Sequence, residues 1–155
     1  MTITYNSQES AAVVKAVMTS GLAIAIADLG IVSTAIEGVA LAKEIAGAAK
    51  KYPNNSIIQG VFSEEALRQH PPEKPKTAEI TPDNALDLAI AAINEAVILL
   101  EPKASPDEIN EFKSFIYVSA ESVANAAGSG LFGTGPKVSD KEAVALNKLK
   151  ATLNV

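Results

Sequence analysis

The chain has 155 residues, a formal net charge of −5 and no cysteine. This length suffices for one domain with its own core, and the lack of thiols excludes disulfides, thiolate metal sites and cysteine nucleophiles. The acidic balance and the few aromatic residues, three Tyr, four Phe and no Trp, disfavour nucleic acid as a partner. We therefore expect a single domain over residues 1–155.

The N-terminal segment predicts a cytoplasmic protein. Its first ten residues carry neither a basic group nor an apolar run, and a secretory signal needs both. The longest uncharged, mainly apolar stretch is the 12 residues between Lys15 and Asp28, whereas a membrane-spanning helix needs about 20. We expect no membrane span.

Apolar residues recur with a helical period along most of the chain, which predicts an all-α fold. The first helix is expected from Ser7 to Ala27. Its predicted core stripe consists of Val14, Val17, Met18, Gly21, Ile24 and Ala25. A second helix is expected from Thr34 to about Lys51, because Thr34 and Glu37 have the spacing of a capping box and Pro53 follows the helix.

The segment of about residues 52–80 is the least regular part of the sequence. Its first half predicts one or two short helical turns, and HPPEKPK after them predicts a proline-rich loop. The single histidine, His70, lies there and is expected to be solvated. A single histidine excludes metal sites that are built from several imidazoles. Its position in a solvated loop also argues against a histidine-dependent catalytic triad.

The second half, about residues 81–155, begins with two predicted helices. Thr81 followed by Pro82 indicates a helix that runs to about Leu100. Its core stripe is predicted to be Ile90, Ile93, Val97 and Leu100. Ser105 opens the next helix with a capping box and proline at the first position, and this helix continues to about Ala127. It is predicted to bury Phe112, Phe115, Ile116, Ser119 and Val123.

The glycine-rich segment GSGLFGTGPK, residues 128–137, separates the last two helices. It has the glycine content of a phosphate-binding loop, but it follows a helix and lacks the G-K-S/T ending. We therefore expect an extended turn, with Leu131 and Phe132 at its tip as a candidate partner contact. Ser139 and Glu142 then form a third capping box, and the last helix is expected to end near Leu153.

The two ends of the chain contain matching segments. EGVALAK, residues 37–43, parallels EAVALNK, residues 142–148, and an alanine-rich helix precedes each. Two interpretations stay open, a duplicated helix-turn-helix unit and chance similarity between two capped helices. We expect a bundle or array of about five main helices plus short turns, with a pseudo-repeated helix-turn-helix unit at each end, the first over about residues 7–51.

Asp28 is placed where the end of a helix carries partial negative charge, which opposes an exposed carboxylate by about 0.3–1 kcal/mol. One interpretation is local, since an aspartate in a turn accepts hydrogen bonds from nearby amides. The functional alternative joins Asp28 and Glu37 around a hard cation, calcium or magnesium in preference to zinc. Glu37 also has a structural role available as the return arm of the capping box.

The two end segments together resemble the tellurite-resistance TerB-like family. The resemblance is carried by AIADLGIVSTAIEG, residues 25–38, and ANAAGSGLFGTGPKVSDKEAVAL, residues 124–146. It implies an all-helical protein associated with tellurite and other stresses that binds a divalent metal through acidic residues. Transferred to this sequence, it implies Asp28 and Glu37 from the first unit and Glu142 from the second as metal ligands. The second unit has Gly128 at the position of Asp28.

The sequence offers no nucleophile with a base beside it, so we expect a protein without enzymatic activity. The favoured hypothesis is a cytoplasmic, stress- or tellurite-resistance-associated protein of the TerB-like kind that binds a divalent cation. The alternative is a helical scaffold or protein-interaction module without a metal site, for which a protein partner or self-association is expected. A third hypothesis is a binder of hydrophobic ligands with a pocket between alanine-rich helices.

Overall fold

The computed structural model describes residues 3–27, 31–73, 80–128 and 138–155, with the side chains of residues 31–37 and 127–128 also outside the description. Within these ranges the chain forms α-helices and no strand, which confirms the predicted all-α fold. The helices are α1 (Ser7–Ala27), α2 (Ile31–Lys51), α3 (Ser56–Phe62), α4 (Glu64–Gln69), α5 (Ala85–Leu100), α6 (Pro106–Gly128) and α7 (Asp140–Leu153).

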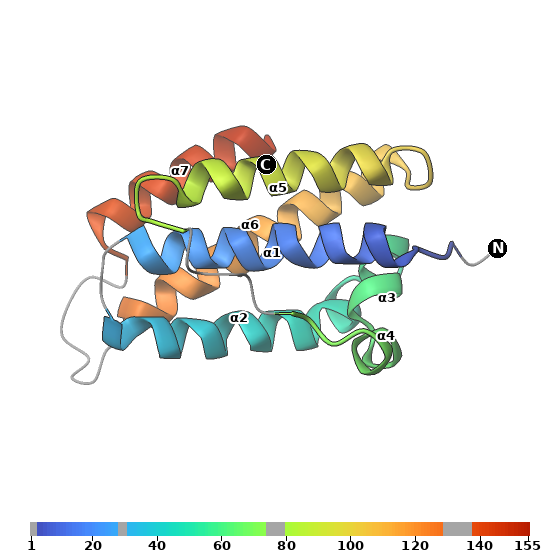
Figure 1. The fold of residues 1–155 in the computed structure, drawn as a ribbon, viewed down its shortest axis with the longest axis horizontal. Coiled ribbons are helices and arrows are strands. Elements are labelled where there is room, and N and C mark those ends of the chain that lie inside the picture. Colours follow the sequence, from blue (N-terminus) through green and yellow to red (C-terminus); the bar gives the residue numbers. More distant parts are fainter. Residues whose placement is uncertain (1–2, 28–30, 74–79, 129–137) are drawn as a thin grey trace.

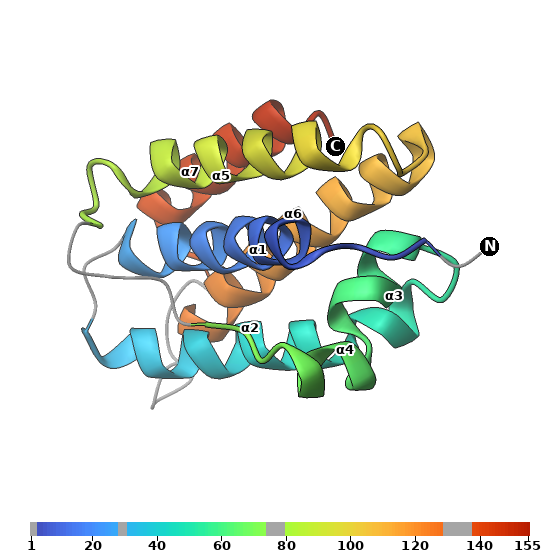
Figure 2. The same ribbon diagram turned by 45° about the vertical axis from the view of Figure 1, so that its right-hand side comes forward.

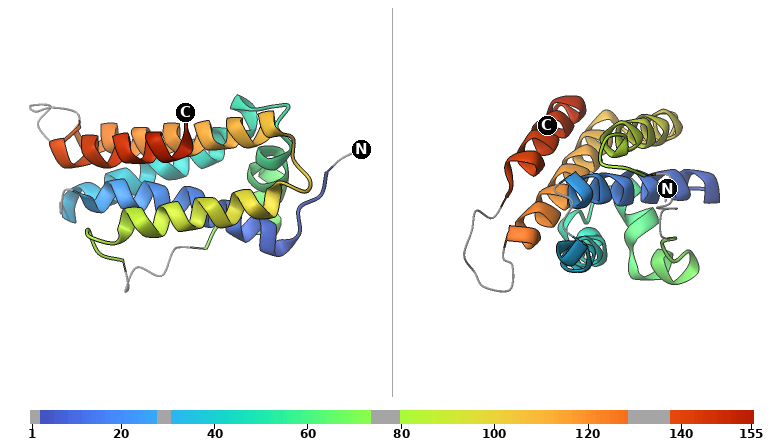
Figure 3. Two further views of the ribbon diagram at one scale, coloured as in Figure 1. Left: turned by 90° about the horizontal axis from the view of Figure 1, so that it is seen from above. Right: turned by 60° about the vertical axis from the view of Figure 1, so that its left-hand side comes forward.

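Helix α1 lies in the middle of the bundle. Helices α5 and α7 lie on one side of it and α2 on the other, while α6 crosses behind and packs against both α1 and α2 (Figures 1 and 2). The short helices α3 and α4 lie at the end of the bundle where the N-terminus enters, as the views in Figure 3 also show. The sequence of α1 is apolar on more than one face, as expected for a helix that neighbours cover on most of its sides.

Small residues let α1 approach its neighbours closely. Ala16 and Ser20 of α1 and Ala120 and Ala124 of α6 are fully or almost fully buried. At Gly21 a Cβ atom would lie 2.6 Å from Cδ2 of Leu41 in α2, so the distance between α1 and α2 depends on the missing side chain.

Aromatic residues fill the core at the α3 end of the bundle. Phe62 of α3 and Phe115 of α6 have ring centroids 5.5 Å apart, and the ring of Tyr52 lies 5.8 Å from that of Phe115. Edge-on and tilted pairs at these distances are favourable beyond the area that they bury. Phe112, Phe115, Ile116, Ser119 and Val123 are all buried, as predicted for α6.

Two helices begin elsewhere than predicted. Helix α2 begins at Ile31, so Thr34 lies inside it. The T-x-x-E spacing also joins neighbouring positions within a helix.

Helix α5 begins at Ala85, because Thr81 starts a separate turn. The N–H of Thr81 donates to Oδ1 of Asn84 over 2.7 Å. The carbonyl of Thr81 accepts from the N–H groups of Asn84 and Ala85. Proline after Thr81 suits such a turn as well as a helix start.

The local starts of the two segments in the predicted repeat differ. Ser139 is the N-cap of α7, whereas its counterpart Ser33 lies within α2. Each unit still consists of two consecutive helices in contact, α1 with α2 and α6 with α7. The duplication itself stays a prediction.

Helix α1 is long and apolar enough to cross a membrane, judged by length and composition, and it alone has this character in the described part of the chain. Of its most apolar window, 56% is buried inside the fold. Core helices of soluble proteins and N-terminal signal sequences share this composition.

Candidate functional site

Of the three carboxylates predicted to bind a metal, the structure places only that of Glu142. Asp28 lies outside the described residues, and so does the side chain of Glu37, whose backbone belongs to α2. Glu142 is 3% exposed. Its carboxylate accepts a hydrogen bond from the N–H of Ser139 over 2.8 Å, and its own N–H donates to Oγ of Ser139 over 3.2 Å. Glu142 thus completes the predicted capping box at the start of α7.

The described residues contain no group of three or more His, Asp or Glu side chains that could hold a metal ion. His70 is exposed directly after α4, as predicted for a solvated loop residue. The glycine-rich loop with Leu131 and Phe132 falls outside the described residues.

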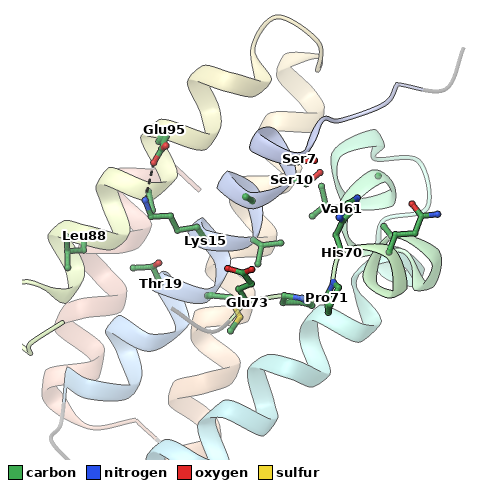
Figure 4. Close-up of a pocket in the computed structure, with 18 of the residues that line it drawn as sticks. Ser7, Ser10, Lys15, Thr19, Val61, His70, Pro71, Glu73, Leu88 and Glu95 are labelled. Atoms are coloured by element: carbon green, nitrogen blue, oxygen red, sulfur yellow. Dashed lines mark hydrogen bonds and ion pairs between the residues drawn. The ribbon is translucent and has the colours of Figure 1, made fainter. Parts of the chain in front are cut away.

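A groove of about 870 Å³ lies beside α1. One wall is formed by α1, a second by α5, and a third by α3, α4 and the loop after α4 (Figure 4). Apolar side chains that line it include Val14, Met18, Val61, Pro71, Leu88 and Ala92. This volume lies in the range of about 300–1,000 Å³ that is typical of small-molecule sites.

The α1 wall comes from residues spaced three and four apart. Ala11, Val14, Lys15 and Met18 share one face of the helix because of this spacing. Val14 and Met18 were predicted to belong to the core stripe, but both are only half-buried and face the groove. The other four members of the predicted stripe, Val17, Gly21, Ile24 and Ala25, are buried, as expected, and Val14 and Met18 pack against this core from its edge.

Three charged side chains of the described lining lie at the edges of the groove. Nζ of Lys15 lies 3.3 Å from Oε2 of Glu95 on α5, and these side chains are 60% and 51% exposed. Glu73, from the loop after α4, is exposed and lies between Lys15 and Pro71 in the view of Figure 4. It has no ion pair or hydrogen bond within the described ranges.

A polar network fixes α3, and with it the third wall, against α6. Oε1 of Glu108 accepts a hydrogen bond from the N–H of Ser56 over 2.9 Å, and Oε2 accepts from the N–H of Ser105 over 2.9 Å. Hydrogen bonds from the Ser56 side chain, and then from the backbones of Ser105 and Ser56, lower the pKa of Glu108 from 4.5 to about 2. Asn55, the N-cap of α3, donates to the carbonyl of Glu108 over 2.9 Å.

The N-terminal segment is fixed to the same end of the bundle. The hydroxyl groups of Tyr5 and Ser56 are 2.8 Å apart, and a Cβ atom at Gly60 would lie 2.8 Å from the Tyr5 ring. Nζ of Lys103 lies 2.8 Å from the carboxylate of Glu9, whose pKa this hydrogen bond lowers. The N-terminal segment and the start of α1 are thus joined by polar contacts to α3 and to the loop between α5 and α6.

The groove could not be located from the sequence, because its walls come from segments far apart in the chain. Lys15, Val61, Glu73 and Glu95 belong to α1, α3, a loop and α5. The one available signal was the apolar character of α1 on more than one face, which indicates a helix with several covered sides.

The chain matches no protein-family model, no curated protein and no solved structure.

Proposed function

We propose that this protein is a non-catalytic helical binding module whose ligand lies in the groove beside α1. The observation that carries the proposal is the groove of about 870 Å³ with the partly exposed side chains of Val14, Met18 and Leu88 on its walls. A ligand that covers such side chains removes apolar surface from water, which contributes about 25 cal/mol per Å². The non-catalytic character rests on the sequence, which has one histidine and no cysteine.

The proposal favours a small apolar ligand over a metal ion as the bound species. Glu142 is engaged in the capping box of α7, whereas the groove provides apolar walls with a few polar groups at the edges, the usual composition of a small-molecule site. The walls formed by α1 and α5 are helices held by the core, so this part of the groove is formed before the ligand binds, which lowers the entropic cost of binding.

Binding of the neutral fluorescent probe Nile red tests the groove. Ala91, on the α5 wall, is exposed and lines the groove, so Ala91→Trp should fill it and weaken binding at least tenfold. Asn94→Trp is the matched control, because Asn94 is exposed on the same helix outside the groove lining. Equal binding by both variants, or no binding by the unmodified protein, would contradict the proposal, provided that circular dichroism shows both variants to be folded. Mass spectrometry of the denatured protein should reveal a co-purifying apolar molecule.

A cytoplasmic role in stress or tellurite resistance, with a divalent cation bound by Asp28, Glu37 and Glu142, is a separate proposal supported by the family resemblance. Calorimetric titration of chelator-treated protein with calcium, magnesium, manganese and zinc tests it. A signal that disappears in Asp28→Asn, with the fold retained, would support it, whereas the absence of heat and of a thermal shift with all four ions would contradict it.

The alternative, a protein-interaction module that self-associates, predicts a dimer or larger species in sedimentation velocity.

A further inference from the structure

We infer that α4 is a movable wall of the groove, which swings as a unit about Ser63 to admit the ligand and then holds it. The inference rests on the proposed function and names how access to the same site is controlled. Three observations carry it: the loss of burial after Ser63, the local hydrogen bonds of α4, and the place of α4 in the groove lining.

Burial changes abruptly where α3 meets α4. None of the six residues of α4 is buried. The one large apolar side chain of α4, Leu67, is half-buried and packs against the core. Segments with so little buried apolar surface open at a lower free energy than the core helices do. By contrast, the seven residues of α3 include four buried ones, Ile57, Ile58, Val61 and Phe62.

The hydrogen bonds of α4 are local, so the helix can move without breaking them. The N–H of Leu67 donates to the carbonyl of Ser63 over 2.9 Å, and the N–H of His70 donates to the carbonyl of Ala66 over 2.8 Å. The Ser63 side chain caps the helix by accepting from the N–H of Ala66 over 3.3 Å. These bonds join residues 63–70 to one another, and a rotation of this segment as a rigid body preserves them.

Ser63 is the point about which α4 turns. It is both the C-cap of α3 and the N-cap of α4, and its backbone is extended, with φ −65° and ψ 156°. Hinges are commonly single residues of this kind at the end of an element. The helix before the hinge is fixed, because Asn55 and Ser56 bond to Glu108 of α6. The movement therefore occurs on the α4 side of Ser63.

Helix α4 contributes a wall that packing in the core does not hold in place. Ala66 and Gln69 line the groove, and His70 and Pro71 follow them along the same wall (Figure 4). An outward swing of α4 widens the groove, and its return brings Ala66 and Gln69 against a bound ligand. Leu67 lies outside the lining, so it sets the position of α4 without touching the ligand.

Native-state hydrogen exchange tests the movement in the unmodified protein. The amides of Leu67 and His70 report on α4, and the amide of Gln59, which donates to the carbonyl of Asn55 over 2.9 Å, reports on α3. We expect the two α4 amides to be at least about tenfold less protected than that of Gln59. Nile red at ten times its Kd should raise their protection about tenfold, because it binds the closed form only. Equal protection of the three amides, or no effect of bound Nile red on α4, would overturn the inference.

The variant Leu67→Ala tests whether the wall controls access. Loss of its packing should speed both association and dissociation of Nile red about fivefold, the factor that half the burial free energy of a leucine gives. The Kd should change less than about twofold, because free and ligand-bound protein lose the same contact. Leu86→Ala is the matched control and should leave both rates unchanged, since Leu86 of α5 is also half-buried against the core and outside the lining.

The outcomes separate access from the groove itself. Unchanged rates in Leu67→Ala, or a higher Kd without faster association, would overturn the control of access by α4 and leave the groove as a binding site. No Nile red binding by the unmodified protein would overturn the proposed function and this inference together, whereas slow exchange of the α4 amides would overturn this inference alone. The exchange measurement needs no variant, so it decides the question even where Leu67→Ala fails to fold.

Discussion

Ser119 lies in α6 with its side chain fully buried, and its hydroxyl has no hydrogen-bond partner within the described ranges. A buried polar group without a partner costs free energy. Ser119→Ala should therefore leave the free energy of unfolding unchanged or raise it by up to about 1 kcal/mol, as measured by urea denaturation.

Ser20 supplies the matched comparison for Ser119. It is equally buried, but its hydroxyl donates to the carbonyl of Ala16 over 2.7 Å. Ser20→Ala loses this bond and should lower the free energy of unfolding by about 0.5–1 kcal/mol. A larger loss in Ser119→Ala than in Ser20→Ala would show that the Ser119 hydroxyl has a partner in solution.

Glu108 makes stability depend on pH, because its pKa is about 2 in the folded protein and 4.5 in the ordinary state. A lowered pKa means that the folded state binds the proton less tightly than the unfolded state. The stabilisation is therefore fully present above about pH 4.5 and is lost as the pH falls from 4.5 toward 2. Urea denaturation at several pH values in this window should show a smaller loss for Glu108→Gln than for the unmodified protein.

The same substitution removes a cap at neutral pH. Glu108→Gln should lower the free energy of unfolding at pH 7 by about 1 kcal/mol, the usual effect of weakening a helix cap. Glu64→Gln is the control, because both Glu64 and its partner Arg68, 3.8 Å away, are highly exposed. Identical acid sensitivity in Glu108→Gln and the unmodified protein would contradict the role of the Ser56 and Ser105 hydrogen bonds.

At the level of helices, Gly21 determines how closely α1 and α2 pack. Gly21→Ala places a Cβ atom 2.6 Å from Cδ2 of the buried Leu41. Overpacking of this kind costs about 1–3 kcal/mol, which is only partly offset by the gain of about 0.5–1 kcal/mol in helix propensity. Gly47→Ala, within α2, has open space around its Cβ, so it should instead stabilise the protein by about 0.5–1 kcal/mol through helix propensity. Thermal denaturation of the two variants compares them directly, and equal effects would contradict the close contact.

The helix boundaries show where local sequence suffices. Ser105 and Ser139 accept hydrogen bonds from backbone N–H groups three residues later, as their capping-box spacing predicted. Thr34 has the same spacing but lies inside α2, and Thr81 belongs to a turn before α5. A capping motif marks a helix start only when the preceding residues leave the helical conformation, and packing against neighbours also influences this choice.

At the level of the whole molecule, ligand binding and stability are linked. A ligand that binds only the folded protein stabilises it by about 2.7 kcal/mol at a free concentration 100 times its Kd. Nile red should therefore raise the melting temperature of the unmodified protein and of Asn94→Trp, and should raise that of Ala91→Trp much less. Equal shifts in all three proteins would place the binding site outside the groove.

The sequence by itself determined the helical fold and most of the core. Periodicity and caps are local properties, so they predicted the buried face of α6, with Phe112, Phe115 and Ile116, and the start of α7 at Ser139. Only the tertiary structure decided that Val14 and Met18 face a groove. It also decided that Lys15 meets Glu95 across 80 residues of sequence. The faces of α1 that become covered depend on where α3, α4 and α5 pack, and the helical period of α1 carries no information about their positions.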